Sequence, residues 1–164
     1  MKPSDFVKTY KQAALIAESQ TGLSWKANLT QAALESGWGK HAPGNNLFGV
    51  KDSDGVNGNE QLLITTEYSK SKNLKFPQIL SIVWDYSKKL WKYRVRDYFR
   101  KYPDCSEIFV EHAKFFESRS RYAAAWTVRN DPYKFFAEIA KAGYATDPNY
   151  AASLCKICKI IENA

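Results

Sequence analysis

The sequence predicts a mostly helical α+β fold with a small antiparallel β element inserted near the middle of the chain. Apolar residues recur every three or four positions in both end regions, whereas apolar and polar residues alternate only in a short central segment. The 164 residues contain no internal repeat and no long linker. We therefore expect one domain over residues 1–164.

Two helices are predicted in the N-terminal region. The first runs from Ser4, a predicted N-cap, to about Thr21, and Gly22 ends it. The second follows Ser24, another predicted N-cap, and ends at a turn that begins with Gly37. Both segments gather their apolar residues on one side, so each is expected to pack against a core.

The central segment, over about residues 51–102, predicts the β element. Residues 62–68 alternate in character and are typical of a strand that ends near Tyr68. Residues 77–92 are predicted to be helical or mixed. Residues 93–102 are predicted to supply a returning strand.

The C-terminal region predicts further helices. They cover residues 106–116 with Ser106 as N-cap, a short stretch at 121–128, residues 131–142 opened by Asp131 and Pro132, and a last helix from Asp147 to about Ile161.

The charge of the chain favours a polyanionic partner. Lys and Arg number 24 against 17 Asp and Glu, which gives a formal net charge of +7. Nucleic acid, anionic lipid and the bacterial cell wall all qualify. The segment 88–96 mixes cations with aromatic rings, as single-strand binders do. No recognised nucleic-acid module accompanies it, so no nucleic-acid partner is expected.

The cysteines and the apolar runs exclude several other classes. Cys105, Cys155 and Cys158 do not form a disulfide framework, and the last two lie on a helical pattern that predicts core packing. No suitable second Cys or His pair and no nucleotide motif is present, so we expect no metal and no cofactor. No apolar run reaches the roughly 18 residues of a membrane span. The stretch after Met1 does not resemble a secretory signal.

Glu35 is the first candidate for chemistry. It lies at the end of an apolar helical pattern, next to a glycine turn and to Trp38. Burial and the negative end of a helix both disfavour the charged carboxylate, so such a residue can hold its proton near neutral pH and donate it. The alternative is a solvated residue on the last turn of a helix.

Cleavage of a glycosidic bond usually takes two carboxyl groups, and Glu67 is the second candidate. It lies at the end of the predicted strand, whereas Glu60 lies in turn-rich surroundings and is the weaker choice. The alternative for Glu67 is an exposed acid at a strand end. A thiol nucleophile would need a nearby histidine, and His112 lies on an apolar helix face, where a core role is predicted.

Several motifs resemble one known family. They occur in family order at Gln31–Gly39, Asn46–Lys51, Thr65–Tyr68, Phe99–Tyr102, Arg121–Ala123 and Ala142–Ala151. Together they resemble the glucosaminidase family of peptidoglycan hydrolases, glycoside hydrolase family 73.

The resemblance implies a lysozyme-like fold and hydrolysis of the β-1,4 bond after N-acetylglucosamine in peptidoglycan. It implies that Glu35 is the general acid and that Glu67 is the second carboxylate on a β-hairpin. Tyr144, the catalytic candidate among the tyrosines, matches a tyrosine near the family's cleft that could hold a water, position the acetamido group, or pack. It also implies a substrate-binding set. That set contains Trp38, Asn46, Phe48, Tyr122 and Tyr150, although Phe48 also fits a core position.

The chain departs from the family pattern at residues 76–96, a basic and aromatic segment that family members often lack. Three roles are open to it: capping the hairpin, extending the glycan-binding groove, or binding a protein partner. A lytic transglycosylase or muramidase on the same fold, and a non-catalytic wall-binding or assembly module, remain alternative functions. We expect a monomer that reaches the cell wall by a non-classical route, such as phage lysis, a phage tail or a secretion system.

Overall fold

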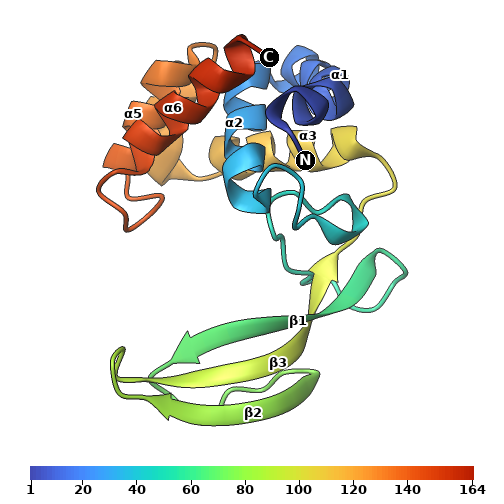
Figure 1. Ribbon diagram of the computed structural model, residues 1–164, viewed down its shortest axis with the longest axis vertical. Helices are drawn as coiled ribbons and strands as arrows, with labels where there is room; N and C mark the ends of the chain where they lie inside the picture. Colours follow the sequence, from blue (N-terminus) through green and yellow to red (C-terminus); the bar gives the residue numbers. More distant parts are fainter. The chain divides into compact units, whose positions relative to one another are not determined.

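The computed structural model describes all residues from Met1 to Ala164 and divides them into two compact units. The helical unit contains residues 1–49 and 102–164, and the β unit contains residues 50–101. Figure 1 shows helices only in the first unit and a small sheet in the second. The predicted α+β class is confirmed, while the assignment of both units to one domain stays a prediction.

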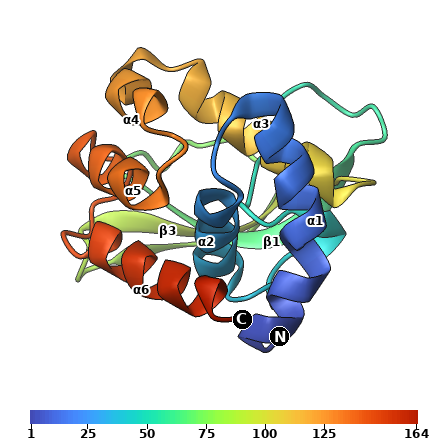
Figure 2. The ribbon, with the colours of Figure 1, turned by 90° about the horizontal axis from the view of Figure 1, so that it is seen from above.

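The helical unit is built around one central helix, α2 (Trp25–Ser36). Figure 2 shows α2 surrounded by the other helices, and it packs against α1, α3, α5 and α6. These elements have the following bounds: α1 Pro3–Thr21, α3 Cys105–Glu117, α4 Ala123–Thr127, α5 Pro132–Lys141 and α6 Tyr150–Glu162, with short 3₁₀ turns at Pro43–Asn45 and Ser120–Tyr122.

The ends of α1 and α2 lie close to the predicted positions, but the two predicted serine caps differ from the prediction. Gly22 ends α1 in the left-handed conformation, at φ 76°. Ser4 is not an N-cap, because the helix already begins at Pro3 after Lys2. Ser24 occupies the N-cap position of α2, but its side chain makes no capping hydrogen bond.

Two carboxylates cap the helices α3 and α5. The prediction of Ser106 as a cap is wrong, because Asp104 holds that position and accepts a hydrogen bond from the Ser106 amide at 2.6 Å. The predicted cap at Asp131 is confirmed, since its side chain accepts from the amides of Tyr133 and Lys134. A charged cap next to the positive end of the helix stabilises the first turn.

Aromatic and aliphatic side chains form the core of the helical unit. Phe116, Phe135, Phe136 and Leu154 are fully buried. Cys158 is also fully buried in this cluster, and Cys155 packs against it. The predicted core role of these two cysteines is confirmed.

The β unit is a three-stranded antiparallel sheet in the order β1–β3–β2 (Figure 1). Its strands are β1 Glu60–Ser69, β2 Gln78–Asp85 and β3 Leu90–Arg100. The predicted first and returning strands are confirmed. The prediction of helical or mixed structure over residues 77–92 is wrong, because β2, a turn and the start of β3 lie there.

The two faces of this sheet differ in what covers them. Glu67 pairs with Tyr93, so both side chains lie on one face, which we call the Glu67 face. Residues 70–77 cross this face and bind Tyr93. The Tyr93 hydroxyl donates to the Ser71 carbonyl oxygen at 2.7 Å, and the Phe76 ring lies 5.5 Å from the Tyr93 ring. Tyr93 and Val95 are therefore fully buried in the sheet's small core.

Candidate active site

Glu35 stands on the last turn of α2, immediately before a sharp reversal of the chain. Gly37, Trp38 and Gly39 all adopt the left-handed conformation, with φ of 57°, 58° and 74°. Only glycine adopts such angles without strain, so Trp38 depends on its surroundings to stay there. The Ser36 hydroxyl accepts from the Gly39 amide at 2.8 Å and stabilises the turn.

The Glu35 carboxyl group has neither a salt bridge nor a hydrogen bond within the protein. Its side chain is still accessible to solvent. Protein atoms nevertheless replace part of its hydration shell, and this desolvation raises its pKa above the ordinary glutamate value of 4.5. The shift has the direction that the sequence predicts for a general acid.

Three tyrosines form an aromatic cluster in the same unit. The rings of Tyr144 and Tyr150 stack with centroids 5.5 Å apart, and Tyr122 lies 6.1 Å from Tyr144. Tyr122 and Tyr150 are buried, whereas Tyr144 is half-buried. The Tyr150 hydroxyl accepts a hydrogen bond from Gln31 of α2 at 3.1 Å, and this bond fixes the cluster to the helix that carries Glu35.

Electrostatics links the tyrosine cluster to Glu35. Burial raises the pKa of Tyr144, and the negative charge of Glu35 raises it further. Burial also raises the pKa of Tyr150, the Gln31 hydrogen bond opposes this rise, and smaller contributions from Tyr144 and Glu35 add to it. Both phenols therefore keep their protons and can donate hydrogen bonds beside a carboxyl group.

The remaining predicted binding residues of the helical unit are partly engaged in packing. Trp38 is half-buried and meets the Phe6 ring edge-on at 5.6 Å. Asn46 is buried, and its amide donates to the Pro43 carbonyl oxygen at 3.2 Å. Phe48 is half-buried and stacks on His112 at 3.8 Å. The substrate-binding roles of these three residues stay predictions.

His112 has the core role that the sequence predicts. It is buried, and its Nδ1 atom lies 2.7 Å from the Asn28 side-chain oxygen. Burial lowers the pKa of His112 to about 3, so the ring is neutral at physiological pH. Its Nε2 atom has no hydrogen-bond partner. A neutral, enclosed ring of this kind is unsuited to proton transfer with a large substrate.

Glu67 lies in the β unit, and a cation holds its carboxylate. The Lys51 ammonium lies 2.8 Å from Glu67 Oε1 and 2.9 Å from Asp97 Oδ2. The Thr65 hydroxyl donates to the same oxygen of Glu67 at 3.3 Å. Burial opposes the charge of Lys51, but hydrogen bonds to the two carboxylates outweigh it and raise the lysine pKa. One Glu67 oxygen is therefore anchored, while nothing in the protein binds the other.

Sequence reasoning missed the role of Lys51. The residue ends the Asn46–Lys51 motif, and that position was the only available signal. Its backbone pairs with Phe99 in an isolated antiparallel bridge, which places the ammonium beside Glu67 on the sheet.

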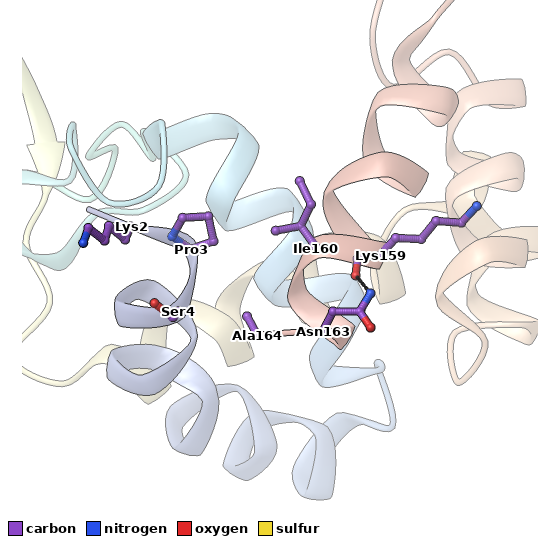
Figure 3. Close-up of a pocket in the computed structure, with 7 residues that line it drawn as sticks. All are labelled: Lys2, Pro3, Ser4, Lys159, Ile160, Asn163 and Ala164. Atoms are coloured by element: carbon purple, nitrogen blue, oxygen red, sulfur yellow. Dashed lines mark hydrogen bonds between the residues drawn. The ribbon is translucent and has the colours of Figure 1, made fainter.

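No metal centre accompanies these residues. No group of three or more His, Cys, Asp or Glu side chains could hold a metal ion. A hollow of about 580 Å³ lies between the start of α1 and the end of α6, next to Pro3 and Asn163 (Figure 3). None of the predicted site residues lines it. None of the helices combines the length and apolar character that a bilayer crossing requires.

Comparison with known proteins identifies the family. The model of the Glucosaminidase family, described as mannosyl-glycoprotein endo-beta-N-acetylglucosaminidase, matches residues 11–163. The peptidoglycan hydrolase FlgJ of Pseudomonas aeruginosa is 30% identical over 162 residues, which cover 94% of this chain and 36% of that protein. An autolysin of Enterococcus faecalis is 30% identical, with 93% of this chain and 19% of that protein covered.

A solved structure confirms the lysozyme-like fold class. The glycoside hydrolase domain of Salmonella typhimurium FlgJ superposes with a TM-score of 0.72 at 27% identity, covering 99% of this chain and 90% of that one. The chain spans less than half the length of the curated relatives named above. From the family match over nearly its whole length, the chain belongs to the glucosaminidase family of glycoside hydrolases.

Proposed function

We propose that this chain is a peptidoglycan hydrolase, an endo-β-N-acetylglucosaminidase that cleaves the β-1,4 bond after N-acetylglucosamine. Family membership and the peptidoglycan hydrolases among the relatives support the substrate class. One structural observation carries the mechanism. Glu35 has no partner, has a raised pKa, and lies within electrostatic reach of two protonated tyrosines.

Glu35 is the general acid of this reaction. A carboxyl group that retains its proton near neutral pH can protonate the departing glycosidic oxygen as the bond breaks. Tyr144 has a free hydroxyl, so it donates a hydrogen bond to the substrate or to an attacking water. Tyr150 is bound to Gln31 and serves to position Tyr144 and the sugar. Trp38, Asn46, Phe48 and Tyr122 complete the binding surface.

Glu67 is the second carboxylate. Lys51 and Thr65 hold one of its oxygens and leave the other for water or for the positive charge that develops at the anomeric carbon. Two roles fit this arrangement: activation of water, or electrostatic stabilisation while the acetamido group of the substrate participates. The separation of the two carboxyl groups in the substrate complex decides between an inverting and a retaining outcome.

The site of action is the cell wall, outside the cytoplasm, and the enzyme acts as a monomer without metal or cofactor. The proposed delivery route is phage lysis, a phage tail or a secretion system. No nucleic-acid partner is proposed.

Product analysis tests the function. Purified peptidoglycan is digested with the protein, and the soluble fragments are identified by mass spectrometry. A reducing N-acetylglucosamine end supports the proposal. An anhydromuramic end indicates a lytic transglycosylase, and a reducing muramic acid end indicates a muramidase. Binding to sacculi without any soluble product indicates a wall-binding module instead.

A further inference from the structure

The face of the sheet opposite Glu67 carries a row of cations on its central strand. Lys92, Arg94 and Arg96 occupy alternate positions of β3, so their side chains leave the sheet on the same side. Their cross-strand partners on β1 and β2 are all uncharged. Tyr68 and Val83 pair with Lys92, Thr66 and Ser81 with Arg94, and Ile64 and Gln78 with Arg96. We call this surface the cationic face.

No salt bridge neutralises the three cations of β3, and the one carboxylate beside them, Asp85 at the end of β2, interacts with Lys88. Arg94 donates a hydrogen bond to the Thr66 hydroxyl at 3.0 Å, and none of the three cations forms a salt bridge. Lys88 adds a fourth cation, since its ammonium lies 3.8 Å from the centre of the Tyr68 ring. On the Glu67 face the arrangement is reversed, because Lys51 there is balanced by Glu67 and Asp97.

Exposed aliphatic side chains lie on the same face as the cations. Leu62, Ile64 and Val83 are 42%, 48% and 53% exposed. Single exposed aliphatic residues are ordinary in proteins. Here, however, three of them flank an unbalanced row of cations on a face that no other segment of the β unit covers. A soluble polyanion would use the cations and gain nothing from the aliphatic residues.

We infer that the cationic face docks on the surface of an anionic phospholipid bilayer. Lys92, Arg94 and Arg96 contact the headgroup phosphates, where each cation near an anionic surface favours binding. The aliphatic side chains enter the boundary between headgroups and acyl chains. This contact is peripheral, since no helix could cross the bilayer. It is also independent of the hydrolytic reaction proposed above.

Vesicle binding tests the inference. The whole protein is sedimented with vesicles of phosphatidylcholine alone and with vesicles that contain phosphatidylglycerol, at low and at high salt. We expect binding to the anionic vesicles that weakens at high salt. The double variant Arg94→Gln, Arg96→Gln should weaken that binding by at least about tenfold.

The matched control removes the same charge from another surface. Lys156→Gln with Lys159→Gln on the exposed side of α6 also lowers the formal net charge of +7 by two. Its binding should stay within about twofold of the wild type, because the effect falls off within a Debye length. Equal losses in both double variants would mean that net charge alone drives binding, and would overturn the inference.

A substitution of an exposed aliphatic residue distinguishes binding to a bilayer from binding to a soluble polyanion. Ile64→Thr keeps the branched strand residue and all charges, and it should weaken vesicle binding by about threefold. Thermal unfolding of each variant checks that the β unit stays folded, and the charge variants leave its core unchanged. Retention on double-stranded DNA without vesicle binding, or no binding to either, would overturn the proposal.

Discussion

The helical unit leaves Glu35 without a partner, whereas the β unit binds Glu67 to Lys51 and Thr65 through one oxygen. Desolvation in the first unit favours a protonated carboxyl group. An ammonium ion 2.8 Å away in the second unit orients a carboxylate and fixes its position. The two glutamates thus have different environments, which fit the roles proposed for them, proton donor and second carboxylate.

The proposed contrast between Glu35 and Glu67 is refuted if the Glu35→Gln variant retains activity. This substitution keeps the size of the side chain but removes the proton donor. We expect release of soluble peptidoglycan fragments to fall by at least about 10²-fold. Circular dichroism should show an unchanged fold. Glu117→Gln, on the exposed end of α3, is the same substitution at another glutamate and should leave the rate unchanged.

The pH dependence of the wild type tests the same residue without mutation. Because desolvation raises the Glu35 pKa above 4.5, the acid stays protonated at a higher pH than an ordinary glutamate. Above that raised pKa, kcat/KM should fall by about tenfold per pH unit. A rate that already declines through the ordinary glutamate range would contradict the assignment of Glu35 as the acid.

The substitution Lys51→Met tests whether the lysine ammonium orients the Glu67 carboxylate in the β unit. The substitution keeps most of the aliphatic stem and removes the cation between Glu67 and Asp97. Loss of carboxylate orientation should lower the rate by about tenfold. The free energy of unfolding should change by only about 1 kcal/mol, since the lysine is exposed. Lys51→Arg is the control and should recover part of the rate. A large loss of stability with an unchanged rate would assign Lys51 a structural role only.

The helical unit and the position of Glu35 on the last turn of α2 could be predicted from sequence because their signals are local. Apolar spacing, Gly22 and Asp131 each act within one or two helical turns, and the structure confirms them. The N-cap of α3 was predicted incorrectly because two candidate residues lie close together in the sequence. Asp104 takes the position instead of Ser106 because its carboxylate is charged.

The β unit was harder to predict because its pattern depends on pairing between distant segments. β2 is an edge strand whose residues are mostly exposed, so it shows no alternation of buried and exposed positions. A register shift between Ile79 and Ser81 interrupts the remaining periodicity. The Lys51–Glu67 salt bridge joins residues from separate motifs, and no local signal connects them.

Tyr144→Phe tests whether the tyrosine cluster contributes chemistry or packing. The ring contacts with Tyr150 and Tyr122 survive, and only the free hydroxyl is lost. Loss of one hydrogen bond of about 1 kcal/mol should lower kcat/KM by about fivefold. The control Tyr150→Phe removes the bond to Gln31 and should lower stability as well as rate. An unchanged rate in Tyr144→Phe would leave this residue a packing role.

The smallest expected effect is on the stability of Glu35→Gln, and it has a defined sign. A carboxyl group whose pKa is raised in the folded state adds to the free energy of unfolding. This added stability is fully present below pH 4.5, the ordinary glutamate value, and is lost as pH rises through the raised pKa. The glutamine variant carries no charge and escapes this loss. It should therefore unfold at a slightly higher temperature than the wild type at neutral pH, and the difference should vanish in acid.

The size of this stability difference should stay below about 0.5 kcal/mol, because the side chain keeps contact with water. Thermal unfolding across the pH range measures it, with Glu117→Gln as the reference for loss of one negative charge. If Glu35→Gln were instead less stable than the wild type at neutral pH, the folded protein would be stabilising the Glu35 carboxylate. Desolvation would then not be the cause of its reactivity, and the contrast between the two glutamates would be lost.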